Sequence, residues 1–147
     1  MIIENLLELF ERDLTKLITE INLYKDENNL WIIKEGIGNS GGNLCLHLLG
    51  NLNHFIGAVL GNTGYVRERE KEFTLKNIPR KELTAGIENV IAVIKNTLPK
   101  LDEKDLEKSF PIEVFGKPMT TAFFLIHLST HLTYHLGQIN YHRRLLA

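Results

Sequence analysis

Apolar residues in the first part of the chain recur every three or four positions, which is the spacing of one face of an α-helix. The members of this stripe are Ile3, Leu7, Phe10, Leu14, Leu17, Ile21 and Tyr24. The pattern predicts a long amphipathic helix that ends near residues 24–29. Four glycines then interrupt the pattern in WIIKEGIGNSGGN, residues 31–43, which predicts a loop with a short extended piece at residues 31–34.

Three further helices follow from the same periodicity. The second is predicted over residues 44–60, where Gly61 and Asn62 end it. Pro79 opens a third helix, because proline is favoured in the first turn. Its apolar stripe is Leu83, Ile87, Val90 or Ile91, Ile94 and Leu98. Thr120 or Thr121 can cap a fourth helix that runs almost to the end of the sequence.

The segments between these helices are polar and long. We expect residues 62–77 to be a loop, and IEVFG within the connection at 99–118 to be a strand-like excursion. Four helices with such connections predict an all-α four-helix bundle that forms a single domain over residues 1–147. The crossover of about 18 residues between the second and third helices can span roughly 60 Å, enough to leave those two helices parallel.

Charge and cysteine content exclude several classes of protein. The formal net charge is −1, so neither a nucleic acid nor an anionic membrane is an expected partner. The apolar runs are too short to span a bilayer. Acidic residues among the first apolar residues argue against a secretory signal, and Cys45 is the only cysteine. We therefore expect a cytoplasmic protein.

Four of the six histidines lie in HLSTHLTYHLGQINYH, residues 127–142 of the predicted fourth helix. At about 100° per residue they share an arc of about 80° with Gln138, directly beside the apolar face. The histidines of this arc are His127, His131, His135 and His142. Imidazoles four residues apart on one helix can both reach a metal ion, and a third from a facing helix would leave an open coordination position.

The predicted second helix repeats this arrangement. His47, Asn51 and His54 lie on one arc beside its apolar face. Glycines inside a helix cost about 1 kcal/mol each relative to alanine, so Gly50 and Gly57 predict close approach of another backbone or a ligand. Two such helices can meet around a polar pocket inside a bundle.

The segments HLLGNLNHFIGAVLGNTGYVRERE and HLSTHLTYHLGQINYHRRLL together resemble the DinB superfamily, including its YfiT-like members, over essentially the whole chain. The resemblance implies an up-down-down-up four-helix bundle, often a homodimer, with a divalent metal such as zinc or nickel. It carries the ligand roles to His47, His131 and His135. Leu145, Leu146 and Phe10 are candidates for the dimer interface.

Other residues near these histidines have open roles. His54 is a rival of His47 for the second-helix ligand, although LHLLGN matches the family pattern at His47. Asn51, His54, Gln138 and His142 are expected to bind substrate or to orient an imidazole. The alternatives are capping or interhelical hydrogen bonds for Asn51 and Gln138, and an exposed or dimer-interface position for His142. In YVRERE, Arg67 or Arg69 can serve an anionic substrate, and a solvated charge run is the alternative.

The reaction is suggested by the resemblance, since no nucleophile motif is present. It implies a metal-dependent thiol S-transferase that uses a low-molecular-weight thiol cosubstrate and a small electrophilic substrate. A bound metal lowers the pKa of a thiol or a water, so the site needs no separate strong base. The alternatives are a metal-dependent hydrolase and a non-catalytic metal-binding or stress-associated bundle. No catalytic residue is assigned.

Overall fold

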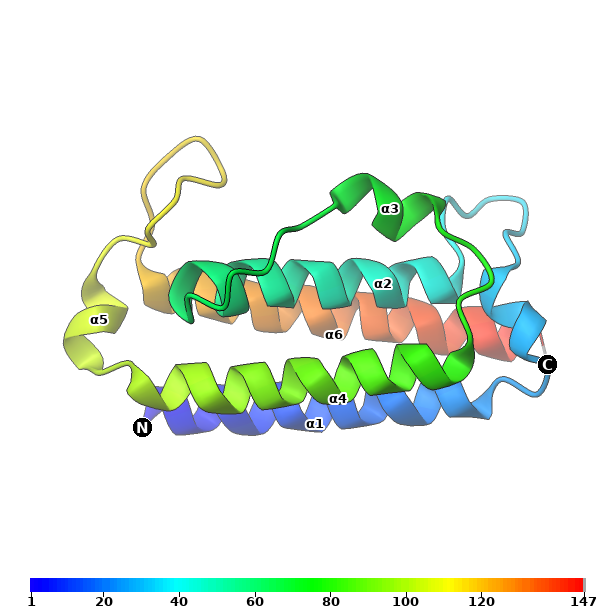
Figure 1. Cartoon of the computed structure of the whole chain (residues 1–147), viewed down its shortest axis with the longest axis horizontal. Helices are drawn as coiled ribbons and strands as arrows, with labels where there is room; N and C mark the ends of the chain where they lie inside the picture. Colours follow the sequence, from blue (N-terminus) through cyan, green and yellow to red (C-terminus); the bar gives the residue numbers. More distant parts are fainter. Residues whose placement is uncertain (147) are drawn as a thin grey trace.

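The computed structural model describes residues 1–146. Four long helices form a bundle: α1 (Ile2–Leu23), α2 (Gly41–Leu52), α4 (Arg80–Thr97) and α6 (Thr121–Leu145). Within these residues it contains no β-strand, so the predicted all-α class is confirmed. Figure 1 shows α1 and α6 running in one direction and α2 and α4 in the other, which is the up-down-down-up arrangement.

The apolar stripes predicted from the sequence form one core. Each of the four helices contributes fully or almost fully buried side chains, among them Phe10, Leu14, Leu48, Ile87, Val90, Leu128 and Ile139. In α4 the buried member of the pair left open is Val90, while Ile91 is only partly buried. Contacts run from α1 to α4 and α6, and from α2 to α4 and α6, so the four helices enclose this core in a ring.

Helix boundaries follow local capping. Thr120 is the N-cap of α6, and its side chain accepts a hydrogen bond from the backbone N–H of Phe123. The second helix begins at Gly41 rather than Leu44, because Ser40 caps it by accepting from Asn43 N–H. The expected loop at 31–43 is therefore shorter than predicted.

The second helix also changes type near its end. After α2, residues Asn53–Leu60 form a π-helical segment, in which hydrogen bonds join residues five apart. The chain then leaves the bundle at Gly61 and Asn62, as expected. Such π-helical turns are frequent at functional sites.

Two predicted loops contain helices that the pattern did not indicate. The polar crossover holds the short helix α3 (Arg69–Thr74), which Figure 1 shows lying along α2. The connection from α4 to α6 holds the 3₁₀ turn η3 (Leu98–Lys100) and helix α5 (Glu103–Glu107).

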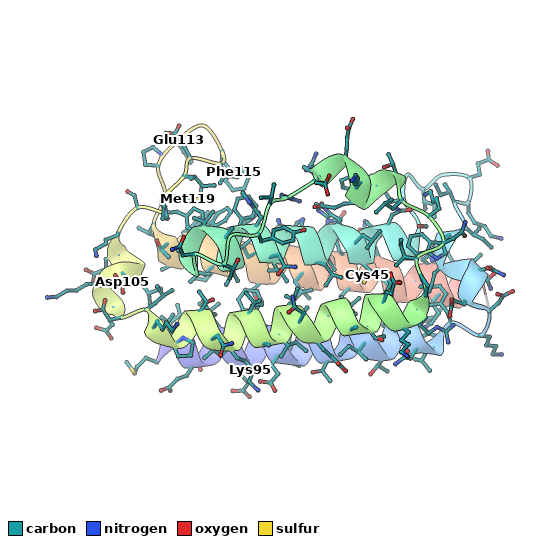
Figure 2. All side chains as sticks on the ribbon, in the orientation of Figure 1. Cys45, Lys95, Asp105, Glu113, Phe115 and Met119 are labelled. Atoms are coloured by element: carbon teal, nitrogen blue, oxygen red, sulfur yellow. The ribbon has the colours of Figure 1, made fainter. Side chains whose placement is uncertain are left out.

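Of the two predicted extended segments, the one at residues 31–34 is met only at Ile32, and the one at IEVFG was wrong. Trp31 ends a 3₁₀ helix, η1 (Glu27–Trp31), and Ile32 after it has extended backbone, whereas IEVFG forms bends in place of a strand. The single bridge of this region joins Ser109 and Thr120, at the two ends of the loop. This loop projects from one end of the bundle, and Figure 2 labels Glu113, Phe115 and Met119 on it.

No helix within residues 1–146 combines the length and the apolar character that crossing a bilayer requires.

Candidate metal centre

Three histidines from two facing helices converge between α2 and α6. His47 comes from α2, and His131 and His135 come from adjacent turns of α6. The Nε2 atom of His131 lies 3.2 Å from Nε2 of His47 and 3.1 Å from Nε2 of His135. One ring nitrogen from each residue lies within 4.8 Å of the others.

Hydrogen bonds on the far side of two rings fix where their protons lie. Nδ1 of His47 is 3.0 Å from Oε1 of Glu72, and Nδ1 of His135 is 2.7 Å from Oε1 of Gln138. An ionised carboxylate and an amide oxygen only accept, so each Nδ1 carries the proton. In the neutral form of each ring, the Nε2 lone pair of His47 or His135 therefore points at His131.

His131 cannot satisfy this arrangement with a proton. Burial, with smaller contributions from the His135 and His47 rings, lowers the pKa of His131 to about 4, so the ring is neutral at neutral pH. A neutral imidazole has one N–H, and Nδ1 of His131 is itself buried without a hydrogen-bond partner. The three facing Nε2 atoms thus share at most one proton and have at least two lone pairs, a condition that a cation relieves.

The spacing of the nitrogens fits a metal ion. Nitrogens bonded at about 2.0–2.1 Å to one tetrahedral zinc ion lie roughly 3.4 Å apart. The two Nε2–Nε2 distances from His131 are close to this value. The donor set of three neutral imidazoles suits zinc, nickel, copper or iron. The residues present therefore fit a divalent metal.

A carboxylate from the crossover supports the His47 side of the centre. Glu72 on α3 is buried and accepts a hydrogen bond from Nδ1 of His47. It also accepts two hydrogen bonds from Arg67, one from Nε and one from Nη2, each 2.9 Å long. Burial tends to raise the pKa of Glu72, but these hydrogen bonds and the Arg67 charge outweigh it and hold the pKa below its ordinary value. Glu72 is therefore ionised and fixes the orientation of His47.

Gly50 makes room for this carboxylate. A Cβ atom at residue 50 would lie 1.8 Å from Oε2 of Glu72, far inside van der Waals contact. The expectation of a close approach at Gly50 is thus met by the Glu72 side chain, not by a backbone or a ligand. Asn43 ties the same segment to α2, because its Nδ2 donates to the carbonyls of Glu72 and Leu75.

A cavity of about 380 Å³ opens beside the histidines. Its wall is made by residues of α2, the π-helical segment, the crossover, the loop before α6, and α6 itself: His47, Asn51, Phe55, Arg67, Arg69, Val114, Phe115, Phe124, His127, Leu128 and His131. Asn51 is 7% exposed, and its Oδ1 has no hydrogen-bond partner within the chain. The cavity therefore reaches two of the three histidines and a polar group that the protein leaves unsatisfied.

The structure does not bring every predicted residue to this centre. His54 lies outside the cluster with its ring edge-on to Phe55, so the structure places His47 and not His54 opposite the α6 pair. His127 lines the cavity and stacks on Phe124. Gln138 contacts His135 as expected of an orienting group.

His142 has a different environment, and we correct its expected place in the pocket. Its Nδ1 is 2.6 Å from the Tyr24 hydroxyl, and its Nε2 is 2.8 Å from the carbonyl oxygen of Ile32. It follows His135 by seven residues, which is about 10 Å along the helix. It therefore joins α6 to α1 and to the segment after η1.

Glu72 is the residue of the centre that the sequence did not reveal. It lies in a run of charged residues that resembles a solvated surface, and no apolar periodicity marks α3. The available signal was Gly50, a glycine inside a helix one turn from a candidate ligand. A second signal was Phe73, an aromatic residue inside that charged run, which in the structure packs with its ring 4.9 Å from that of His47.

Fold and site together define an all-α bundle with a three-histidine centre compatible with metal binding. Residues 3–147 match the family described as "Protein of unknown function (DUF1572)", and the chain belongs to this family.

A solved structure shares the fold. The crystal structure of a DinB-like protein from Bacillus cereus ATCC 10987 superposes with a TM-score of 0.75 at 19% identity, covering 97% of this chain and 91% of that chain. The fold that the resemblance implied, a DinB-like helical bundle, is confirmed by this structure. No curated protein matches the chain.

Proposed function

We propose that this protein is a divalent-metal-dependent enzyme whose metal ligands are His47, His131 and His135. The observation that carries the proposal is the convergence of three imidazole nitrogens, two with lone pairs fixed toward the third, beside a cavity. Zinc or nickel is the expected metal, because both accept neutral imidazole ligands. Three protein ligands leave a position open, as in catalytic zinc sites.

The cavity favours an enzyme over a metal store. A closed structural site has four protein ligands, and no fourth His, Cys, Asp or Glu of residues 1–146 joins this cluster. The space in front of His47 and His131, about 380 Å³, is within the usual size of small-molecule sites. A substrate can therefore reach the histidines.

The proposed reaction is transfer of a low-molecular-weight thiol to a small electrophile. When bound, a divalent metal lowers the pKa of a coordinated thiol or water and so supplies a nucleophile at neutral pH. The chain contributes the rest: Glu72 holds His47 in one tautomer, and Asn51 presents an amide to whatever occupies the cavity. A cytoplasmic location would supply such thiols in reduced form.

Metal analysis followed by thiol titration tests the proposal. We expect the purified protein to hold close to one zinc or nickel ion per chain, and cobalt-substituted protein to change its visible spectrum when bacillithiol, mycothiol, glutathione or coenzyme A binds. His135→Ala should abolish both signals, and His54→Ala should retain them. Metal without any thiol response, together with metal-dependent ester or amide cleavage, would favour a hydrolase. Full metal content in His135→Ala would refute the ligand assignment.

We also propose that the protein is a homodimer. Supporting this, α6 exposes Phe123, Ile126, Tyr134, Tyr141 and Leu145, which recur every three to eight residues on its outer side. Phe10, a candidate from the sequence, is fully buried in the core and takes no part. Light scattering should give twice the 16.9 kDa chain mass at micromolar concentration. A mass of one chain would exclude the dimer.

A further inference from the structure

The cavity beside the histidines has a cationic rim and no anionic one. Two arginines of the crossover, Arg67 and Arg69, line it, and no Asp or Glu is among its lining residues. The two arginines differ in their partners. Arg67 forms an ion pair with Glu72 through two hydrogen bonds, and its side chain is largely buried.

Arg69 is the cation that remains available. Its guanidinium lies 5.4 Å above the centre of the Phe73 ring, and it forms no ion pair with any carboxylate of residues 1–146. Stacking on a ring leaves the edge of a guanidinium, with its N–H donors, free to bind a carboxylate in a bidentate manner. A single uncompensated positive charge therefore faces the cavity.

The remainder of the wall is aromatic. The Phe124 ring lies 4.9 Å from the ring of Phe55, and Phe115 lies edge-on to His127 with ring centres 5.0 Å apart. These rings form an apolar surface against which a flat or branched hydrocarbon part of a ligand can pack. Asn51 adds a buried amide oxygen without a partner, which would accept from an N–H or O–H group of a ligand.

From these features we infer that the cavity binds a small carboxylic acid with an aromatic or branched apolar body, and that Arg69 holds the carboxylate. The inference rests on the proposed function in one respect: it names the class of electrophilic substrate that would lie beside the metal. Binding of the carboxylate itself uses Arg69 and does not require the metal, so the two can be tested apart.

The test compares 3-phenylpropionate with 3-phenylpropionamide, which differ in charge and little in shape. Binding is measured by amide chemical-shift titration of the chelator-treated, metal-free chain at about pH 8. We expect the acid to bind about tenfold more tightly than the amide, because one charge-assisted contact is worth about that factor. The shifts should centre on residues 51, 69 and 115.

Variants of Arg69 and a matched arginine complete the test. Arg69→Gln should remove the preference for the acid, and Arg69→Lys should keep part of it. Arg144→Gln is the control, since Arg144 also stacks on a ring, that of Tyr141, but does not line the cavity. Equal affinity for acid and amide, no binding of either at millimolar concentration, or equal effects of Arg69→Gln and Arg144→Gln would overturn the inference. A chain that binds the acid but never a metal would refute the proposed function and leave this inference standing.

Discussion

Two buried or half-buried histidines of the same helix, His131 and His142, lie on the same arc of α6 and have opposite surroundings. His131 faces two ring nitrogens that offer only lone pairs, and its own Nδ1 has no partner. His142 has a hydrogen-bond partner on each ring nitrogen, Tyr24 and the Ile32 carbonyl. The position of a histidine on the helix therefore sets only the direction of its side chain. The partners of its ring nitrogens determine whether it can serve as a metal ligand or only stabilises the fold.

The largest expected effect comes from removing His131. His131→Ala should weaken zinc binding by roughly 100- to 1,000-fold. Zinc sites with four ligands have binding free energies of about 10–16 kcal/mol, so the loss of one ligand costs roughly a quarter of that. Competition with a chromophoric chelator measures the affinity. His142→Ala is the matched control and should change the affinity by less than about twofold. If the two variants lose zinc equally, the distinction between the two histidines fails.

Removing His142 should act on stability instead. His142→Ala deletes two hydrogen bonds, leaves the Tyr24 hydroxyl and the Ile32 carbonyl without this partner, and opens a cavity. We expect the free energy of unfolding to fall by about 2–4 kcal/mol, measured by urea denaturation. Tyr24→Phe removes the bond to His142 and a longer one, of 3.3 Å, to the Ile139 carbonyl, but it keeps the His142 bond to Ile32 and should cost less. A loss below about 0.5 kcal/mol for His142→Ala would show that this network is not structural.

A smaller effect is expected from the carboxylate behind His47. Glu72→Gln retains the shape but removes the charge that fixes the His47 tautomer, so zinc affinity should fall by about 10- to 100-fold. Glu70→Gln, on the exposed side of the same helix α3, should leave it unchanged. Wild-type affinity in Glu72→Gln would mean that His47 is oriented by packing alone.

The smallest expected effect is a pH dependence. Burial lowers the pKa of His142 below its ordinary value, against a hydrogen bond to the Ile32 carbonyl that raises it. In the unfolded chain the group takes up a proton near pH 6.5, whereas in the folded chain it does so only at lower pH. Its contribution to stability is therefore complete above about pH 6.5 and is lost as the pH falls below that value.

Comparison with a variant isolates this contribution from the other histidines. His142→Gln keeps a donor near the Ile32 carbonyl and cannot titrate. Urea denaturation between about pH 5 and pH 7 should therefore show a steeper loss of stability for the wild type than for this variant. Parallel curves would contradict the assigned direction of the pKa shift.

Much of the fold could be predicted from apolar periodicity. The stripes of α1 and α4, the Thr120 cap of α6 and the end of the second helix at Gly61 all agree with the sequence. Short helices such as α3 could not be predicted, because six residues span less than two turns and show no period. The start of α2 at Gly41 was missed because glycines at a helix N-terminus resemble a loop.

The centre could be predicted in part. Spacing placed His131 and His135 on one face, and the structure sets His47 opposite them, while metal binding itself stays a prediction. Angular position alone grouped His142 with them, since a helical projection ignores distance along the axis. Gly50 indicated a close approach but not its partner Glu72, because the contact of Glu72 with His47 depends on how the crossover folds back over α2.

The attachment of the crossover to α2 has a consequence for local opening of the protein. The segment is fastened by Glu72 to His47 and by Asn43 to the carbonyls of Glu72 and Leu75. A ligand that holds His47 in place also favours the closed crossover, because binding stabilises whichever state it requires. Amide hydrogen exchange and limited proteolysis within residues 61–79 should therefore slow when zinc is added. The same addition should leave exchange in the loop at 111–119 unchanged. The crossover, a segment on the surface, would thus report whether the site inside the bundle is occupied.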